Sequence, residues 1–147
     1  MDEFIKLLDT NLNYIKHEIS DNICNITVES NRQEAKCPFC SVISTKVHSV
    51  YSRGFQDLPI QGKKVNVIIR NRKMLCKSPN CEHKTFAERF EFISKKAKKT
   101  KRLEDEIARL ALNCSSIAAS EILKRNVVDV GKSTICNLLK KRNSGCQ

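Results

Sequence analysis

Two close pairs of cysteines are the residues of this sequence whose type and spacing most clearly indicate chemistry. Cys37 and Cys40 flank Pro38-Phe39, and Cys76 and Cys81 flank a second short segment after 35 intervening residues. Thiolates two to four residues apart can bind one Zn²⁺ tetrahedrally, with Zn–S distances of about 2.3 Å. We therefore expect a structural zinc site with these four cysteines as its ligands.

Disulfide formation is the first alternative for these pairs. The sequence shows no charged-then-apolar secretory leader and no apolar run long enough to span a bilayer. We therefore expect a cytoplasmic, reducing location and no membrane partner, which favours metal over disulfides. A histidine, His83, is an alternative metal ligand that could compete with Cys81.

The other four cysteines are isolated in the sequence. Cys24, Cys114 and Cys136 lie in apolar or helical segments, where a thiol packs like a small hydrophobic side chain, and Cys146 lies in a polar tail. None of the three histidines has a spacing typical of a cysteine–histidine pair, and the sequence has no glycine-rich phosphate loop. We therefore expect no catalytic residues and no enzymatic activity.

The net charge of +11 is unevenly distributed along the chain. Residues 1–36 have four basic and seven acidic side chains, whereas residues 37–147 have 23 basic and nine acidic ones, a net charge of +14. Such an excess favours a polyanionic partner. The densest run of basic residues is either a solvated linker or an arm that binds along the phosphates of a nucleic acid. The residues of this run that could contact phosphates are Lys95, Lys96, Lys98, Lys99, Lys101 and Arg102.

The elements that must position the cysteines are read from hydrophobic periodicity. Helical spacing predicts an amphipathic helix over residues 2–18, and a short strand is expected at residues 23–28. Stretches of β-branched residues at 42–51 and 63–70 predict two more strands, with Gly54, Pro59 and Gly62 interrupting the chain between them. The inward face of the second should be Val65, Val67 and Ile69, and the expected hydrophobic filling is Phe39, Phe55, Phe86 and Phe90.

Beyond the basic run the apolar period changes from two to 3.6 residues, which predicts three helices. The apolar residues of the first helix are Leu103, Ile107, Leu110 and Ala111. The second helix begins at Ser115-Ser116, and its apolar residues are Ile117, Ala118, Ile122 and Leu123. The third helix runs from Lys132 to about Arg142, and its inward residues should be Ile135, Leu138 and Leu139. The predicted fold is α+β. It comprises an N-terminal helix and short strand (1–36), an antiparallel zinc-ribbon sheet (37–93), a basic linker (94–102), and a three-helix domain with a C-terminal tail (103–147).

Three short helices with a tight turn before a basic last helix are typical of a helix-turn-helix unit, whose last helix enters the major groove of DNA. Asn137 is the best candidate base reader, because its amide can donate to and accept from adenine together. Phosphate and supporting contacts are expected from Lys132, Ser133, Thr134, Lys140, Lys141 and Arg142. A three-helix packing unit that binds no nucleic acid explains the same pattern.

Several short motifs occur in one order over about residues 37–93: the first cysteine pair, Val47–Arg53, Asp57–Ile60, Arg70–Lys73, the second cysteine pair and Lys84–Phe90. Together they resemble the N-terminal region of the ISL-three family of insertion-sequence transposases. The resemblance implies a zinc ribbon and a helix-turn-helix that recognise the inverted repeats at the ends of a mobile element. Family members continue into a catalytic domain, whereas this sequence ends at Gln147, so we expect no cleavage of DNA strands. We interpret acidic residues such as Asp57 and Glu88 as turn and surface residues and not as catalytic ones.

We therefore expect a zinc-dependent, sequence-specific protein that binds double-stranded DNA in the bacterial cytoplasm, associated with the nucleoid. A zinc-stabilised protein-interaction module, or a transposition regulator with no direct DNA contact, is the main alternative. RNA binding ranks lower because the sequence has no Trp and few aromatic residues to stack on bases. The apolar face of the N-terminal helix would serve a homodimer as well as a core.

Overall fold

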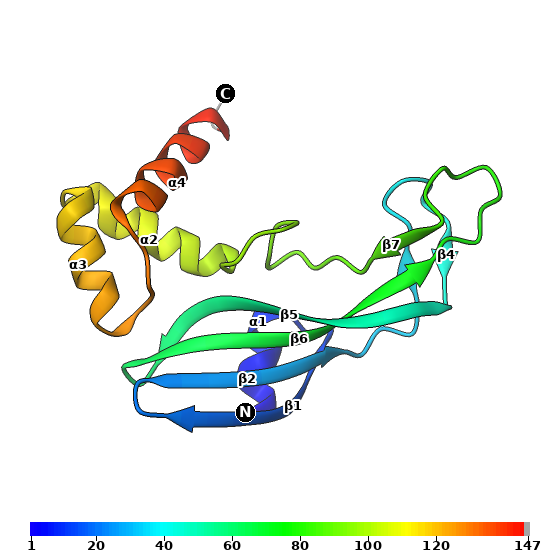
Figure 1. Cartoon of the computed structure of the whole chain (residues 1–147), viewed down its shortest axis with the longest axis horizontal. Coiled ribbons are helices and arrows are strands. Elements are labelled where there is room, and N and C mark those ends of the chain that lie inside the picture. Colours follow the sequence, from blue (N-terminus) through cyan, green and yellow to red (C-terminus); the bar gives the residue numbers. More distant parts are fainter. Residues whose placement is uncertain (146–147) are drawn as a thin grey trace. The chain divides into compact units, whose positions relative to one another are not determined.

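The computed structural model describes residues 1–145 and shows an α+β protein, as the sequence predicts (Figure 1). The described residues form four helices and seven strands. In chain order these are α1 (Asp2–Leu8), β1 (Leu12–Ser20), β2 (Ile23–Ser30), β3 (Ala35–Lys36), β4 (Ile43–Ser44), β5 (Val47–Ile60), β6 (Lys63–Leu75), β7 (Thr85–Ala87), α2 (Lys101–Asn113), α3 (Ser116–Asn126) and α4 (Lys132–Gly145).

The strands form two sheets. In the larger sheet the order is β1-β2-β6-β5, and β7 pairs antiparallel with β6. The two short strands β3 and β4 pair antiparallel as a small second sheet. The chain divides into two compact units, one formed by residues 1–16, 26–54 and 68–91, the other by residues 17–25, 55–67 and those from Phe92 on. The boundary between the units therefore falls within four strands.

The N-terminal helix is shorter than the sequence predicts. Helix α1 ends at Leu8 and residues 12–20 form β1, so the prediction of one helix over residues 2–18 is wrong. The backbone N–H of Asn11 donates to the side chain of Asp9 at 2.7 Å, a local turn that competes with helix continuation. Leu12 is fully buried in the sheet, and this burial outweighs the helical periodicity of the segment.

Strands β5 and β6 are joined by the two-residue turn Gln61-Gly62. The φ angles of these residues are 48° and 75°, both left-handed, as in the type I′ turn whose twist matches that of paired strands. The predicted interruptions at Gly54 and Pro59 are wrong, because β5 continues through both to Ile60. A proline is tolerated there because β5 lies at the end of the strand order.

Strand β6 confirms the predicted alternation. Val65, Val67 and Ile69 are all at most 2% exposed, and the residues between them are more accessible. The β-branched side chains at these positions suit a pleated surface with one buried face. Three of the four predicted filling aromatics are buried, namely Phe55, Phe86 and Phe90.

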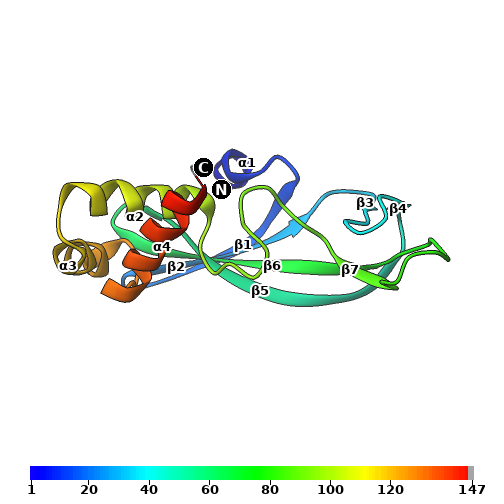
Figure 2. The ribbon, with the colours of Figure 1, turned by 90° about the horizontal axis from the view of Figure 1, so that it is seen from above.

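Helices α2, α3 and α4 pack against one another in all three pairs (Figure 2). Their predicted positions are confirmed. The hydroxyl of Thr100 accepts from the backbone N–H of Leu103, and that of Ser115 accepts from the backbone N–H of Ala118, so both helix starts are capped. The core of this group comprises Leu103, Ile107, Ala111, Ala119, Leu123, Val128, Val130 and Ile135.

Two of the four apolar residues that mark α3 in the sequence are exposed. Ile117 and Ile122 are 55% and 49% exposed, whereas Ala119 and Leu123 are buried. These two buried residues are four positions apart and therefore share one face of the helix. Apolar residues occur on both sides of α3, so contacts with α2 and α4 decide which side is buried.

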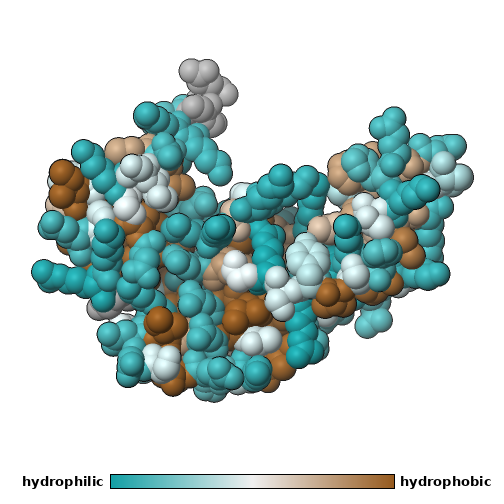
Figure 3. Space-filling model, viewed as in Figure 1, coloured by the Kyte–Doolittle hydropathy of each residue, from teal (hydrophilic) through white to brown (hydrophobic). Residues whose placement is uncertain are grey.

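The surface visible in Figure 3 is largely hydrophilic, with small hydrophobic patches. Among residues 1–145, none of the helices combines the length and apolar character needed to cross a membrane.

Candidate metal centre

The four predicted ligands lie in two turns, each at the end of a strand. Cys37 directly follows β3, and Cys76 directly follows β6. In the first turn the backbone N–H of Ser41 donates to the carbonyl of Cys37 at 2.9 Å, and that of Cys37 donates to Val42 at 2.9 Å. In the second, the N–H of Cys76 donates to the carbonyl of Lys84 at 2.8 Å. The strands therefore fix the direction in which each pair of thiols points.

A further backbone hydrogen bond joins the two chain segments that lie next to these turns. The N–H of Leu75, the last residue of β6, donates to the carbonyl of Lys46, which follows β4, at 2.9 Å. Segments about 30 residues apart in sequence are thereby held side by side. This pairing brings one cysteine pair to the other.

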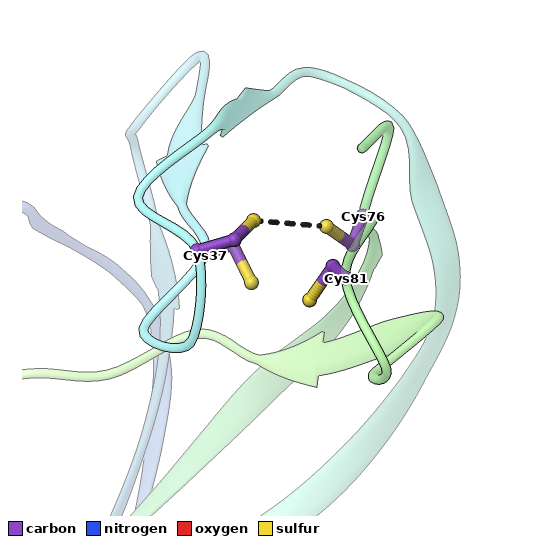
Figure 4. Close-up of side chains that lie close together, drawn as sticks. Cys37, Cys76 and Cys81 are labelled. Atoms are coloured by element: carbon purple, nitrogen blue, oxygen red, sulfur yellow. Dashed lines mark hydrogen bonds between the residues drawn. The ribbon is translucent and has the colours of Figure 1, made fainter. Parts of the chain in front are cut away.

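The sulfur atoms of Cys37, Cys40, Cys76 and Cys81 all lie within 4.8 Å of one another, and those of Cys40 and Cys76 are 3.4 Å apart. Figure 4 shows the sulfur atoms of Cys37, Cys76 and Cys81 pointing toward one another. A tetrahedron of thiolates around Zn²⁺ places the sulfurs about 3.8 Å apart, whereas a disulfide needs about 2.05 Å. The cluster therefore fits a four-thiolate zinc site and contains no disulfide.

The thiols have unequal proton affinities. Burial raises the pKa of Cys37, but hydrogen bonds with the backbone at Phe39 and Cys40 and with neighbouring thiols outweigh it and lower the pKa to about 7. The backbone N–H of Ser78 lowers the pKa of Cys76, yet burial and the surrounding thiols together raise it to about 12. A hydrogen bond from the backbone at His83 lowers the pKa of Cys81, but burial and the thiol of Cys40 outweigh it, so the pKa of Cys81 is also raised. A divalent cation is what allows all of these sulfurs to be ionised together.

Zinc affinity is expected to fall as the pH is lowered. Cys76 and Cys81 keep their protons at neutral pH without metal, so binding must displace at least these two protons. Each displaced proton changes the apparent affinity by about tenfold per pH unit. Competition with a chelator of known pH dependence, at pH 6, 7 and 8, measures this slope. An affinity independent of pH over this range would contradict thiolate coordination.

The hydrophobic support of the site is small. Ala35, Cys37, Met74 and Phe86 form its buried core, and the other three cysteines pack against it half-buried. A core of this size contributes little net stability on its own, so the metal must supply much of it.

Phe39 and His83 lie on the surface beside the cluster. Phe39 is 47% exposed, so the prediction that it fills the core is wrong. Its ring stacks on that of His83 with centroids 3.6 Å apart, and Arg89 lies over the Phe39 ring at 5.7 Å. In the described part of the chain, the group of potential metal ligands consists of the four cysteines and does not include His83.

Three of the four isolated cysteines lie within the described residues, and none of the three belongs to the four-thiol cluster. Cys24 is buried, and burial raises its pKa. Cys114 and Cys136 are half-buried, and their thiols contact the carbonyl of Leu110 and the hydroxyl of Ser116. Cys146 lies outside the described residues.

Two acids interpreted from sequence as turn or surface residues are instead buried, which corrects that interpretation. Glu88 is 2% exposed and accepts hydrogen bonds from Arg72 at 3.0 and 2.9 Å. Asp57 is 4% exposed; it accepts from the hydroxyl of Thr100 at 2.8 Å and forms a two-point ion pair with Arg102. Asp57 raises the pKa of Arg102. No sequence pattern pointed to these pairs, because their members are 16 and 45 residues apart.

The predicted nucleic-acid contacts fall in two places. On α4, the residues Lys132, Ser133, Thr134, Asn137, Lys140, Lys141 and Arg142 are all exposed. In the basic run, Lys95, Lys96, Lys98 and Lys101 are exposed and Lys99 is half-buried. Arg102 is paired with Asp57 and Arg142 with Asp105. Backbone hydrogen bonds of Lys98 and Thr100 with Gln56 tie part of the predicted linker to β5.

Residues 33–81 match the family model for the zinc-finger of transposase IS204/IS1001/IS1096/IS1165. The matched segment contains all four clustered cysteines, and the two observations together support a structural Zn²⁺. No curated protein matches the chain, and no solved structure matches it.

Proposed function

We propose that this chain is a zinc-dependent protein that binds double-stranded DNA with sequence preference, as the end-recognition region of a transposase does. The proposed contacts are the exposed face of α4 and the basic run at residues 95–102, which ends in the first residues of α2. The ribbon at 37–93 and the helical region from 103 on are proposed as functional regions and not as separate folded bodies, because residues 55–67 belong to the same compact unit as the helices. The observation that carries the proposal is the four-thiol cluster inside a segment similar to a transposase zinc-finger.

The surface of α4 supports this role. Ser133, Asn137 and Lys140 are exposed and recur four and three residues apart, which places them on one face of the helix. Ile135 is fully buried on the opposite side. A helix with a buried apolar side and a polar, basic free side can enter a major groove, as the second helix of a helix-turn-helix does. We therefore propose a helix-turn-helix formed by α3 and α4.

The charge distribution supports a polyanionic partner. Residues 37–147 have a net charge of +14. The proposed role is binding rather than catalysis, because four thiolates complete a tetrahedral zinc site and leave no open position for a substrate. The proposed target class is the inverted repeats of a mobile element, and the proposed location is the bacterial nucleoid.

A protein-interaction role is the second candidate, and α1 favours it. Phe4 and Leu7 of this helix are 59% and 76% exposed, although apolar. Exposed apolar side chains on an acidic helix suit a protein partner, including a second copy of the chain. This role predicts no salt-sensitive retention of duplex DNA.

Asn137→Ala is expected to relax sequence preference. Duplexes are first selected from a random pool with zinc-loaded protein, and affinities for selected and random duplexes are then measured by fluorescence anisotropy. Loss of a two-point contact to adenine reduces discrimination by about 5- to 150-fold. Lys98→Ala should instead weaken both duplexes alike and reduce the salt dependence by about 0.9 in log–log slope.

Asn143→Ala is the matched control, because Asn143 is an exposed amide farther along the same helix. Its discrimination should equal that of the unmodified protein. If Asn137→Ala and Lys98→Ala have the same effect on both duplexes, the assigned roles are wrong. If the unmodified protein enriches no sequence and shows no salt-sensitive binding, the proposed function is wrong.

A further inference from the structure

The tip of the β5–β6 hairpin lies beside the turn that precedes α4. The ammonium of Lys64 donates to a carboxylate oxygen of Asp129 at 2.6 Å. Asp129 lies between Val128 and Val130, which are 1% and 3% exposed, and α4 begins three residues after it. Both partners belong to the second compact unit. The hairpin tip is therefore adjacent to the start of the proposed recognition helix.

Contacts along β5 attach the hairpin to the helices. Leu58 packs against the helical core. Gln56 donates its backbone N–H to Lys98 at 2.8 Å and accepts from Thr100 at 3.0 Å. The carboxylate of Asp57 holds the cap residue of α2, Thr100, at 2.8 Å. The hairpin and the three helices therefore form one folded body rather than parts joined by a flexible linker.

The turn before α4 is also anchored from the helix side. The hydroxyl of Ser120, on α3, is buried and donates to the carbonyl of Val130 at 2.7 Å. With Val128 and Val130 in the core, the backbone around Asp129 has little freedom to move. The side chain of Asp129 nevertheless remains 70% exposed. The location of the hairpin tip relative to α4 is thus set by packed residues on both sides.

The charge around this tip is predominantly positive. Lys63 and Lys64 directly follow the turn, and Lys63 donates to the uncharged carbonyl of Asp21 at 2.5 Å. Lys124, Arg125 and Lys132 flank the α3–α4 connection and are exposed. The acids next to the two hairpin lysines are Asp21 and Asp129. The two hairpin lysines and the three basic residues that flank the α3–α4 connection thus outnumber these two acids.

We propose that the hairpin tip, residues Gln61–Lys64, contacts the phosphate backbone of duplex DNA beside the groove that α4 enters. This inference rests on the proposed function and adds a second contact element to it. The ion pair between Lys64 and Asp129 is partly exposed, at 20% and 70% for the two side chains, so it adds little to folding. A DNA phosphate can therefore replace the carboxylate of Asp129 as the partner of Lys64.

The test compares duplex binding by zinc-loaded full-length variants over a range of salt concentrations. The double variant Lys63→Ala/Lys64→Ala should bind selected and random duplexes alike about tenfold more weakly, and its log–log salt slope should be smaller by about 1.8, which corresponds to two lost phosphate contacts. Asp129→Asn should bind about two- to threefold more tightly, because it removes a negative charge next to the proposed phosphate path. Lys73→Ala is the matched control, since Lys73 is an exposed lysine at the other end of β6.

A second measurement does not depend on how the double variant folds. A photoreactive phenylalanine analogue at Gln61, which is exposed, should crosslink to bound duplex, whereas the same group at exposed Phe4 should not. If the unmodified protein binds duplex but position 61 does not crosslink and the double variant binds normally, the hairpin contact is wrong and the proposed function stands. If the unmodified protein does not bind duplex at all, both are wrong.

Discussion

Removal of zinc is expected to unfold the segments that contain the cysteine pairs, residues 35–46 and 76–87. The strands in these segments have only two or three residues, and their buried core has four side chains. Metal binding contributes on the order of 10 kcal/mol in comparable small zinc modules, far more than such a core. Hydrogen exchange followed by mass spectrometry, before and after chelation, should show loss of protection in these two segments and recovery on addition of Zn²⁺.

Single substitutions separate loss of the metal from general damage. Cys76→Ser removes one ligand and should reproduce the exchange pattern of the chelated protein. Cys136→Ser is the matched control, because this half-buried thiol lies on α4, outside the cluster. It should retain one equivalent of Zn²⁺ and normal protection. Protein that remains fully protected after complete removal of zinc would contradict a structural role for the metal.

Glu88→Ala is expected to lower the free energy of unfolding of the first compact unit by about 3 kcal/mol or more. The Glu88 carboxylate is 1% exposed and holds Arg72 by two hydrogen bonds and Ser30 by one of 2.7 Å. Arg32 lies within 3.6 Å of it. Removal of the acid leaves two arginines partly buried without their carboxylate partner. Urea unfolding of zinc-saturated protein measures the change.

Glu91→Ala is the control for that substitution, because Glu91 lies three residues away and is exposed. Its stability should stay within about 0.5 kcal/mol of the unmodified protein. In a double-mutant cycle, Arg72→Ala should cost less when Glu88 is already alanine, since the shared interaction is then absent. Equal costs in both backgrounds would show that the pair is not coupled.

The zinc site illustrates how much a sequence can reveal when its signals are local. Cys37 and Cys40 are close enough in the chain to share a metal through one turn, and the same holds for Cys76 and Cys81. Their assignment therefore required no knowledge of the fold. The order in which the thiols lose their protons could be assigned only from the fold, because the pKa of Cys37 depends on backbone hydrogen bonds and neighbouring sulfurs.

The first 20 residues show the opposite case. Their apolar spacing is helical, yet only Asp2–Leu8 forms a helix, and Leu12 is buried in a sheet. A short isolated helix is marginally stable, so the strand partner available to residues 12–20 decides the outcome. That partner, β2, is visible only once the chain is folded.

The sequence alone determined the features that depend on residues close together in the chain. These are the cysteine spacing, the serine at the start of α3, the alternation of β6 and the basic character of the later residues. Tertiary structure decided which partners meet. The ion pairs of Glu88, Asp57 and Asp129 join residues 16, 45 and 65 positions apart. Long-range pairs of this kind depend on how strands and helices pack, because charge and hydrogen bonding act over distances in space and are independent of separation along the chain.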